Sequence, residues 1–368
     1  MKRGWKIALG LLAGLAVLLA VNTVTTDSQT KAAEVTAEGG QILQLSRGDV
    51  QVTDSGEPTG ASPGQPIVLL HCYACSLHWF DAIEPLLAER HRVIRIDLLG
   101  FGGSEKPESG YEIPAQAQVV AEAMNQLGVD GALVAGNSMG AGVTASLAEQ
   151  ASQLVDRAVV IDWAPNTKDF GPGLPFQAKL SYLPVLGEAL WRITPDFAVR
   201  KSYEESVAPG YDLEDGFDDP DQVLADYDAM TYTSFDSAPA EADDYVEELP
   251  LDERFKRVPV PLLVIFGAED QIFDAERSVE GFADVPGVQT EIIEGAGHAP
   301  QVEQPEEVAA LLEGFSVDPV EPSASDRPAS PTRRGDRRNK SRQRSDAPRG
   351  GGQAGREPRQ EQPGSGNT

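Results

Sequence analysis

The sequence predicts an α/β fold, with a mostly parallel central sheet, helices on both faces and an inserted, mainly helical cap. Three observations indicate this fold class. Short, continuously apolar segments alternate with segments of helical periodicity, as buried parallel strands and their crossover helices require. This alternation stops between Trp163 and Val258 and then resumes, which predicts an insertion. Residues 132–151 combine an apolar run, a serine flanked by glycines and a helix-favouring segment, which indicates a strand, a sharp turn and a helix.

The individual elements follow from the same patterns. Residues 42–45 and 49–53 alternate apolar and polar side chains around an Arg-Gly pair, which predicts an antiparallel hairpin at a sheet edge. Apolar runs predict strands at residues 66–70, 132–135, 158–162 and 261–266. Residues 92–97 are predicted to be another central strand, and residues 289–293 a further strand. Helical patterns occur at residues 79–88, 115–127, 141–151 and 305–315. Strands connected in this way need right-handed crossovers, so both faces of the sheet should be covered.

The insertion, about residues 164–257, is expected to lie over the carboxyl edge of the sheet as a cap. Candidate short helices within it are residues 184–193, 196–206 and 221–230. The segment has no Lys or Arg between Lys201 and Arg254, and it contains an acidic run formed by Asp212, Glu214, Asp215, Asp218, Asp219 and Asp221. The spacing of these acids does not match an EF-hand loop, so we expect a solvated acidic surface rather than a calcium site.

Length and composition limit the domain organisation and the partners. The chain has 368 residues and a net charge of -28, which suits one large domain at residues 41–316 and does not suit a nucleic-acid partner. Residues 317–368 are rich in Pro, Gly, Ser, Gln and Arg and contain no aromatic side chain. Such a segment has little to bury, so it is predicted to be a disordered tail.

The N-terminus has the pattern of a membrane or export segment. Lys2, Arg3 and Lys6 accompany an apolar run at residues 7–21. The run is intermediate in length between a signal-peptide core and a membrane span of about 20 residues. Because no small-x-small cleavage site closes the run, residues 1–25 are predicted to be an uncleaved anchor rather than a cleaved signal, followed by a linker at residues 26–40. Either alternative places the body outside the cytosol, membrane-anchored or secreted.

The two cysteines, Cys72 and Cys75, are separated by two residues. Outside the cytosol, one interpretation is a local disulfide. His71 and His78 flank the pair and give a zinc-binding pattern as the alternative. Adjacent His and Cys ligands reach a tetrahedral site poorly, so the zinc interpretation is disfavoured and no metal is expected.

A serine hydroxyl needs a base within hydrogen-bond reach and a third group that orients the base. Ser138 stands at the predicted turn, and His298 lies in a glycine-rich loop after the last strand. Loops that leave the carboxyl ends of parallel strands collect at one edge, so His298 is the candidate base. Asp270, after a strand end, is the preferred orienting carboxylate, with Asp162 as its rival and Glu269 as a weaker candidate.

Attack of the serine on a carbonyl would create an oxyanion that needs N–H donors. Met139 begins the predicted helix after Ser138, so its N–H group is one candidate donor. The loop that follows residues 66–70 is expected to supply the second donor, through Tyr73. This chemistry needs no metal and no organic cofactor.

Four motifs, taken together in this order, resemble those of α/β-hydrolase-fold enzymes of the capped, single-chain esterase type. They are Asp97-x-x-Gly-x-Gly-x-Ser104, Gly136-Asn137-Ser138-Met139-Gly140, Gly267-Ala268-Glu269-Asp270 and Gly297-His298. The resemblance covers about residues 40–316 and implies the fold and a Ser-His-Asp site. Serine at the turn separates the chain from the dehalogenase and epoxide-hydrolase branches, which use aspartate there.

The chain departs from the family pattern at the second oxyanion donor. The family usually has His-Gly where this chain has His71-Cys72. Cysteine lacks the backbone freedom of glycine, so the oxyanion hole is expected to differ in shape or to be pinned by a bridge between the two cysteines.

The expected function is that of an extracytoplasmic serine hydrolase that cleaves a small-molecule ester or related acyl compound. Because the superfamily also contains lipases, thioesterases, C–C bond hydrolases and cofactor-free perhydrolases, the resemblance leaves the substrate open. A perhydrolase or a C–C bond hydrolase is therefore an alternative. A non-catalytic protein that binds a small ligand on a hydrolase scaffold is another.

Overall fold

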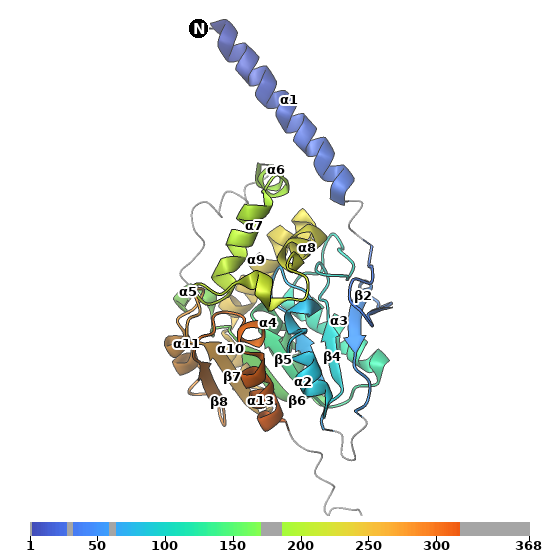
Figure 1. Cartoon of the computed structure of the whole chain (residues 1–368), viewed down its shortest axis with the longest axis vertical. Helices are drawn as coiled ribbons and strands as arrows, with labels where there is room; N and C mark the ends of the chain where they lie inside the picture. The colour runs from blue at the N-terminus through green and yellow to red at the C-terminus, as the bar shows by residue number, and fades with distance from the viewer. Residues whose placement is uncertain (1, 28–31, 59–63, 171–185, 317–368) are drawn as a thin grey trace, which may run out of the picture. The chain divides into compact units, whose positions relative to one another are not determined.

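The computed structural model describes residues 2–27, 32–58, 64–170 and 186–316. Its central feature is one eight-stranded sheet with the strand order β1-β2-β4-β3-β5-β6-β7-β8 (Figure 1). The strands are β1 (Gln41–Leu43), β2 (Val50–Asp54), β3 (Ile67–Leu70), β4 (Val93–Ile96), β5 (Ala132–Asn137), β6 (Val155–Ile161), β7 (Leu262–Gly267) and β8 (Gln289–Ile293). The pairs β1·β2 and β2·β4 are antiparallel and the other five pairs are parallel, which confirms a mostly parallel sheet with an edge hairpin.

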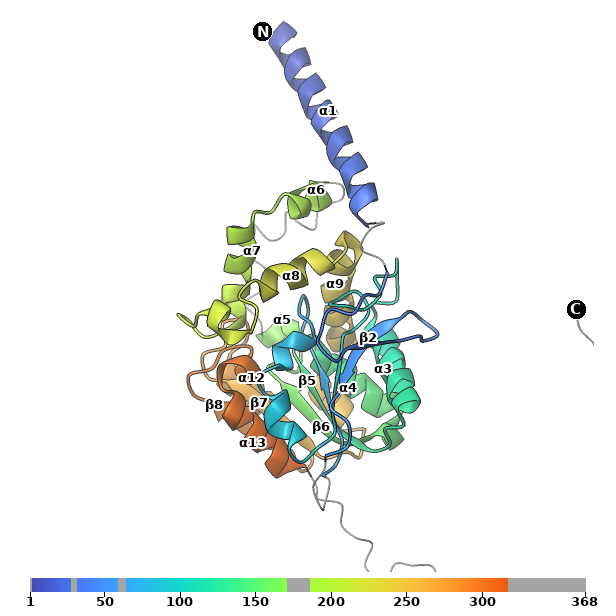
Figure 2. The same ribbon diagram turned by 45° about the vertical axis from the view of Figure 1, so that its right-hand side comes forward.

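Both faces of the sheet are buried. Along β3, Val68 and Leu70 pack into one apolar cluster, whereas Ile67 and Leu69 pack into the other. Helices α3 (Ile113–Leu127) and α4 (Met139–Gln150) cover the first face, and α2 (Glu84–Ala88) and α13 (Pro305–Phe315) cover the second (Figure 2). A strand buried on both faces is mostly apolar, which is why the continuous apolar runs at residues 66–70, 132–135 and 261–266 predicted β3, β5 and β7 correctly.

The described part of the insertion between β6 and β7, residues 162–170 and 186–261, is mainly helical, as predicted. It contains α5 (Thr167–Phe170), α6 (Leu186–Arg192), α7 (Asp196–Tyr203), α8 (Gln222–Ala229), α9 (Tyr232–Glu248) and α10 (Leu251–Phe255). In both views α7 and α8 lie beyond one end of the strands (Figures 1 and 2). Side-chain hydrogen bonds join them to the loop that follows β3: the Tyr203 hydroxyl donates to the Ala74 carbonyl, and Trp79 Nε1 donates to Asp226 at 2.8 Å. The insertion therefore caps the carboxyl ends of the strands.

The longest cap helix, α9, was not predicted. Pro239 lies inside it, and proline normally disrupts a helix interior. The helix persists because Thr231 and Ser234 form a reciprocal capping box at its start. Its buried side chains, among them Ala238 and Val246, also pack into the apolar cluster that covers the first face of the sheet. Tertiary packing here outweighs the local sequence signal.

Other boundaries also differ from the predictions. The single helix predicted at residues 79–88 is instead two elements, a 3-10 turn at Leu77–Phe80 and the separate helix α2. The second element begins next to Pro85, because proline is favoured in the first turn of a helix. Helices α11 (Ala275–Gly281) and α12 (Pro300–Glu303) were not predicted. The start of the predicted helix 184–193 and the whole predicted tail, residues 317–368, lie outside the described residues.

The N-terminal segment forms the helix α1 (Lys2–Asp27). Its window Gly4–Val21 has a mean hydropathy of 2.0 and is long and apolar enough to cross a membrane. Large apolar side chains on it are exposed, for example Trp5 and Leu11. A signal sequence would have the same length and composition, so the helix fits either an anchor or a signal.

Candidate active site

Ser138 occupies a strained turn between β5 and α4. Its backbone has φ 50° and ψ −121°, a conformation that residues with a side chain rarely adopt. A Cβ added to Gly136 would collide with the carbonyl of Gly140, and one added to Gly140 would collide with the carbonyl of Leu70. Both glycines of the motif are therefore required for the close approach of β5, α4 and the end of β3.

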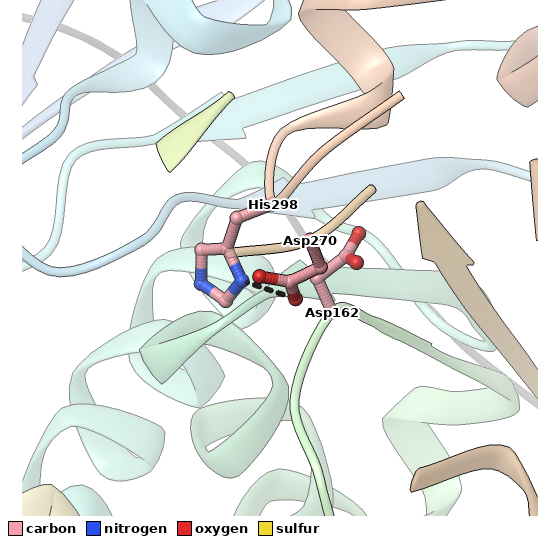
Figure 3. A group of neighbouring side chains, drawn as sticks. All are labelled: Asp162, Asp270 and His298. Atoms are coloured by element: carbon pink, nitrogen blue, oxygen red, sulfur yellow. Dashed lines mark hydrogen bonds and ion pairs between the residues drawn. The ribbon is translucent and has the colours of Figure 1, made fainter. Parts of the chain in front are cut away.

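His298 is paired with Asp270. His298 Nδ1 lies 2.9 Å from Asp270 Oδ2, and both side chains are buried (Figure 3). The other carboxylate oxygen of Asp270, Oδ1, accepts hydrogen bonds from the backbone N–H groups of Ile272 (2.7 Å) and Phe273 (3.2 Å). Three donors thus fix the carboxylate of Asp270. Of the two strand-end aspartates that the sequence offered, the structure pairs Asp270 with the imidazole.

The loop that carries His298 is attached to the turn that carries Ser138. Asn137, the residue before Ser138, donates a hydrogen bond from Nδ2 to the backbone carbonyl of His298 at 3.0 Å. Gln301 Nε2 in turn donates to Asn137 Oδ1 at 3.2 Å. These amide contacts join the two loops at one edge of the sheet.

The same loop is also attached to the cap. Glu303 is buried, and its two carboxylate oxygens accept the N–H groups of Gly297 (2.8 Å) and of Ala208 in the cap (2.6 Å). Gln271, next to Asp270, donates to the backbone carbonyls of Glu204 and Val207 in the same cap segment. The cap segment 204–208 is therefore held by side chains adjacent to both the Asp270 and the His298 positions. Sequence reasoning missed Glu303 because its partners lie far away in the sequence.

Asp162 stands behind the pair formed by His298 and Asp270. Asp162, Asp270 and His298 each place one atom so that the three lie within 4.8 Å of one another (Figure 3). Burial raises the pKa of Asp162 well above its usual value, and the neighbouring charge of Asp270 raises it further. The Nδ1 of His298 and both oxygens of Asp270 already have hydrogen-bond partners, so we assign no metal to this cluster.

The loop after β3 contains the proposed second oxyanion donor, Tyr73. Cys72 and Cys75 form a disulfide across the loop, with their Cα atoms 5.3 Å apart. The zinc interpretation of these cysteines is therefore wrong in the described structure, because both sulfurs are used in the bridge. Between them, Ala74 has φ 58°, a conformation rare for alanine. The Tyr73 hydroxyl donates to the Phe235 carbonyl of the cap at 2.8 Å.

His71 supports this loop and takes no part in a metal site. It is fully buried, and burial lowers its pKa, so the imidazole is neutral. Its Nε2 accepts the N–H group of Leu98 at 3.0 Å, which leaves the proton on Nδ1, 2.7 Å from the Cys72 carbonyl. The imidazole thus fixes the carbonyl that precedes Tyr73 by donating to it.

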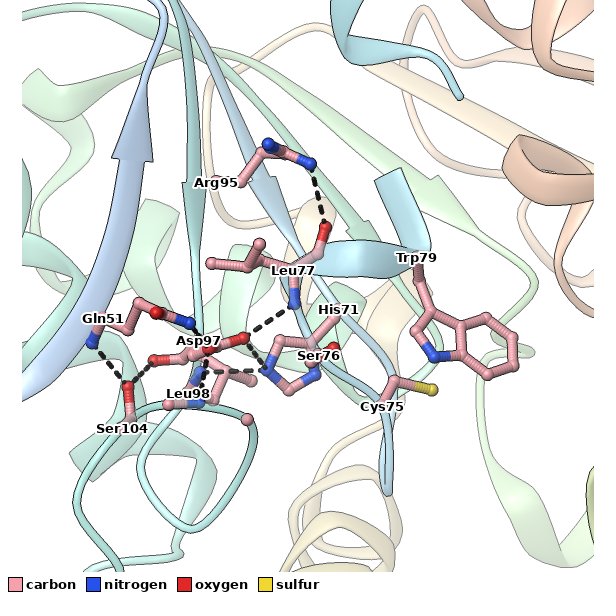
Figure 4. Close-up of polar contacts among 12 residues, drawn as sticks. Gln51, His71, Cys75, Ser76, Leu77, Trp79, Arg95, Asp97, Leu98 and Ser104 are labelled. Atoms are coloured by element: carbon pink, nitrogen blue, oxygen red, sulfur yellow. Dashed lines mark hydrogen bonds and ion pairs between the residues drawn. The ribbon is translucent and has the colours of Figure 1, made fainter. Parts of the chain in front are cut away.

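The Asp97-x-x-Gly-x-Gly-x-Ser motif is structural. The Asp97 carboxylate accepts the N–H groups of Leu77 and Gly103 and the side-chain amide of Gln51, each at 2.7 Å (Figure 4). A Cβ on Gly102 would collide with this carboxylate. Asp97 therefore ties the edge hairpin, the glycine turn and the loop after β3 together. Gln51 was not predicted, since a glutamine in the predicted hairpin gives no sign of a buried partner.

A cavity of about 680 Å³ lies in the cap, but it does not include the catalytic candidates. Its lining combines residues of the segment 200–223, such as Arg200 and Tyr211, with Gln271. Ser138, Asp270 and His298 are not among its lining residues. We therefore do not assign the substrate to this cavity.

Comparisons with known proteins agree with the architecture. The alpha/beta hydrolase fold family matches residues 65–305, more than half of the chain. An uncharacterized protein of Mycobacterium tuberculosis is 27% identical over 277 residues, which cover 73% of this chain and 80% of that protein. The 2-hydroxymuconate semialdehyde hydrolase of Pseudomonas putida is 28% identical over 239 residues, covering 62% of this chain and 78% of that enzyme.

The solved structures agree on the fold. A thermophilic esterase from Thermogutta terrifontis superimposes with a TM-score of 0.58 at 22% identity, covering 75% of this chain and 97% of the esterase. At that identity the similarity concerns the fold alone. With the family match over residues 65–305, these findings place this chain in the alpha/beta hydrolase fold family, as a hydrolase.

Proposed function

We propose that the protein is a serine hydrolase that cleaves a carboxylic ester or a related acyl compound through Ser138, His298 and Asp270. The observation that carries the proposal is the hydrogen bond between His298 Nδ1 and Asp270 Oδ2, on a loop that Asn137 joins to the Ser138 turn. An imidazole that donates from Nδ1 to a carboxylate has Nε2 available as the acceptor of a serine proton.

The chemistry proceeds in two steps. Ser138 Oγ attacks the carbonyl carbon while His298 Nε2 takes the hydroxyl proton, and the protonated imidazole then gives this proton to the leaving alcohol. Water, deprotonated by His298, then attacks the acyl carbon, and the protonated imidazole returns this proton to Ser138 Oγ as the acid is released. Asp270 holds the imidazole orientation through both steps.

Two backbone N–H groups are proposed to stabilise the oxyanion. Met139 begins α4, so its N–H group has no carbonyl partner within the helix. Tyr73 is the second donor, held by the disulfide on either side of it and by its hydroxyl contact with the cap. One such donor typically stabilises the transition state by about 3 kcal/mol.

The surroundings of Tyr73 favour an apolar acyl group. The centroid of the Tyr73 ring lies 5.9 Å from that of Phe101 and 6.3 Å from that of Phe235. Phe235 also contacts Trp191 and Tyr232 of the cap. An aromatic cluster beside a proposed oxyanion donor would stabilise apolar rather than charged acyl chains.

We propose further that the enzyme acts outside the cytosol, with α1 as its membrane anchor. The support is the length and composition of Gly4–Val21 and the basic residues before it. Fractionation of cells that express the full chain tests this proposal. We expect the protein in the membrane fraction at its full mass, and a shortened protein in the medium would show a cleaved signal instead.

Turnover of p-nitrophenyl butyrate tests the catalytic proposal. We expect Ser138→Ala and His298→Ala each to lower kcat by a factor of about 10⁴ or more, and Asp270→Asn by nearly as much. The control is Ser146→Ala, a buried serine on the same helix as Met139, which should leave kcat unchanged. Tight binding of an apolar ligand without turnover by the wild type would instead favour a non-catalytic binding protein.

A further inference from the structure

Three buried carboxylates surround the His298 loop. Asp162 follows β6, Asp270 follows β7 and Glu303 lies on α12. Asp162 is fully buried, Asp270 has no exposed side-chain surface and Glu303 is 8% exposed. Carboxylates packed this closely in a dry environment do not all ionise, because each charge disfavours the next. One of the three should therefore carry a proton.

The hydrogen-bond partners identify which one. Asp270 accepts two backbone N–H groups and His298 Nδ1, and Glu303 accepts the N–H groups of Ala208 and Gly297. Asp162 Oδ1 accepts the N–H group of Gly267 at 2.9 Å. Within the described residues, nothing donates to Asp162 Oδ2, although this atom is fully buried. An ionised oxygen without a donor is strongly disfavoured there.

We propose that Asp162 is protonated at neutral pH on Oδ2 and donates a hydrogen bond to Asp270, as a neutral positioning residue. The orphaned oxygen then becomes a donor, and one negative charge remains on Asp270 beside His298. Burial and the charges of Asp270 and Glu303 all act in this direction. The role in catalysis depends on the proposed function, whereas the protonation of Asp162 does not.

The backbone at Asp162 determines which substitutions are informative. Its φ is +48°, a region that Asp, Asn and Gly tolerate and that alanine adopts only rarely. Asp162→Asn keeps a neutral side chain, with an NH2 group that donates and a carbonyl oxygen that accepts. Asp162→Gly removes the side chain without introducing backbone strain. Asp162→Gly therefore tests the loss of the donor without distorting the chain, and Asp162→Asn tests whether a neutral donor is sufficient.

Infrared difference spectroscopy tests the protonation directly. The difference between the spectra of the wild type and Asp162→Asn at pH 7 should show the C=O band of one protonated carboxylic acid. This band should shift in deuterated water. The matched control is Asp226→Asn: burial raises the pKa of Asp226 to about 6, so its band should be strong at pH 5 and weak at pH 7. Absence of the Asp162 band at pH 7 would overturn the proposal.

Turnover tests the positioning role. Asp162→Asn should keep kcat within about threefold of the wild type, whereas Asp162→Gly should lose about tenfold with little change in KM. If Asp162→Asn loses as much kcat as Asp162→Gly, the donor role is wrong. A wild type that shows the infrared band but hydrolyses no ester contradicts the proposed function and still supports a protonated Asp162.

Discussion

The side-chain amide of Asn137 donates a hydrogen bond to the backbone carbonyl of His298 at 3.0 Å. These residues are distant in the sequence, and the contact joins the end of β5 to the loop after β8. The residue next to the proposed nucleophile thereby holds the main chain of the proposed base. Its loss should affect catalysis more than stability.

Asn137→Ala leaves the carbonyl of His298 without this donor. We expect kcat to fall about tenfold and the free energy of unfolding to fall by about 1 kcal/mol. Ester turnover and urea denaturation measure the two quantities. The control, Asn125→Ala, removes an exposed amide on α3 that bonds only within its helix, and it should change neither. Equal turnover by the two variants would show that the contact has no catalytic role.

Gly297 should not tolerate a side chain. A Cβ at this position would collide with the backbone of Val207 and Ala208 in the cap. Gly297→Ala must therefore displace either the cap segment or His298, and we expect a loss of kcat of about 100-fold or more. The control is Gly314→Ala in helix α13, where an added Cβ meets no atom within 4 Å. It should retain activity and raise the melting temperature slightly, because alanine favours helix more than glycine does. Full activity of Gly297→Ala would show that the contact between Gly297 and the cap segment does not position His298.

The disulfide should be needed for full activity. Cys72 and Cys75 bracket Tyr73, so reduction releases the loop that carries the proposed oxyanion donor. With a phosphine reductant we expect kcat to fall about tenfold or more, with a smaller change in KM. The chain has no other cysteines, so the double variant Cys72→Ser/Cys75→Ser should start at the reduced level and be insensitive to reductant. If that variant has wild-type kcat, the bridge does not shape the oxyanion hole.

Asp226 should make the stability depend on pH. Burial raises its pKa from 3.8 to about 6, although hydrogen bonds from Ser76, Trp79 and Gln222 oppose the shift. The folded state thus binds the proton more tightly than the unfolded state. As the pH rises from about 4 to about 6, this group should lower the free energy of unfolding by up to about 3 kcal/mol in total.

Urea denaturation at pH 4.5 and pH 7 measures this effect. Asp226→Asn should gain stability relative to the wild type as the pH rises, because the amide has no charge to bury. The exposed Asp284 supplies the control, and Asp284→Asn should follow the wild type at both pH values. Parallel curves for Asp226→Asn and the wild type would rule out a buried titrating carboxyl at position 226.

Much of the architecture could be predicted from local patterns. Residues 66–70 are apolar because β3 is buried on both faces, and β3 covers Ile67–Leu70. Gly136 is dictated by its contact with the nearby backbone of Gly140, so the turn around Ser138 was recognisable too, whereas Gly140 is dictated by the distant carbonyl of Leu70. Elements whose cause is local periodicity or local sterics leave a mark in the sequence.

The remaining features depend on contacts between distant segments. Asp162 and Asp270 both follow apolar strands, and only the loop geometry, in which Ile272 and Phe273 donate to Asp270, distinguishes their roles. Glu303 is an ordinary helix glutamate until the fold brings Ala208 to it. Helix α9 could not be predicted, because Pro239 lies within it and the packing that stabilises it comes from the rest of the domain.

Labelling with a fluorophosphonate probe tests the central claim most directly. The probe reacts with a serine only when a neighbouring base activates it, so we expect wild-type protein to gain one adduct, mapped by peptide mass spectrometry to Ser138. His298→Ala should label far more slowly, and Ser138→Ala should not label. An adduct at another residue, or equal labelling of Ser138→Ala and the wild type, would contradict the account.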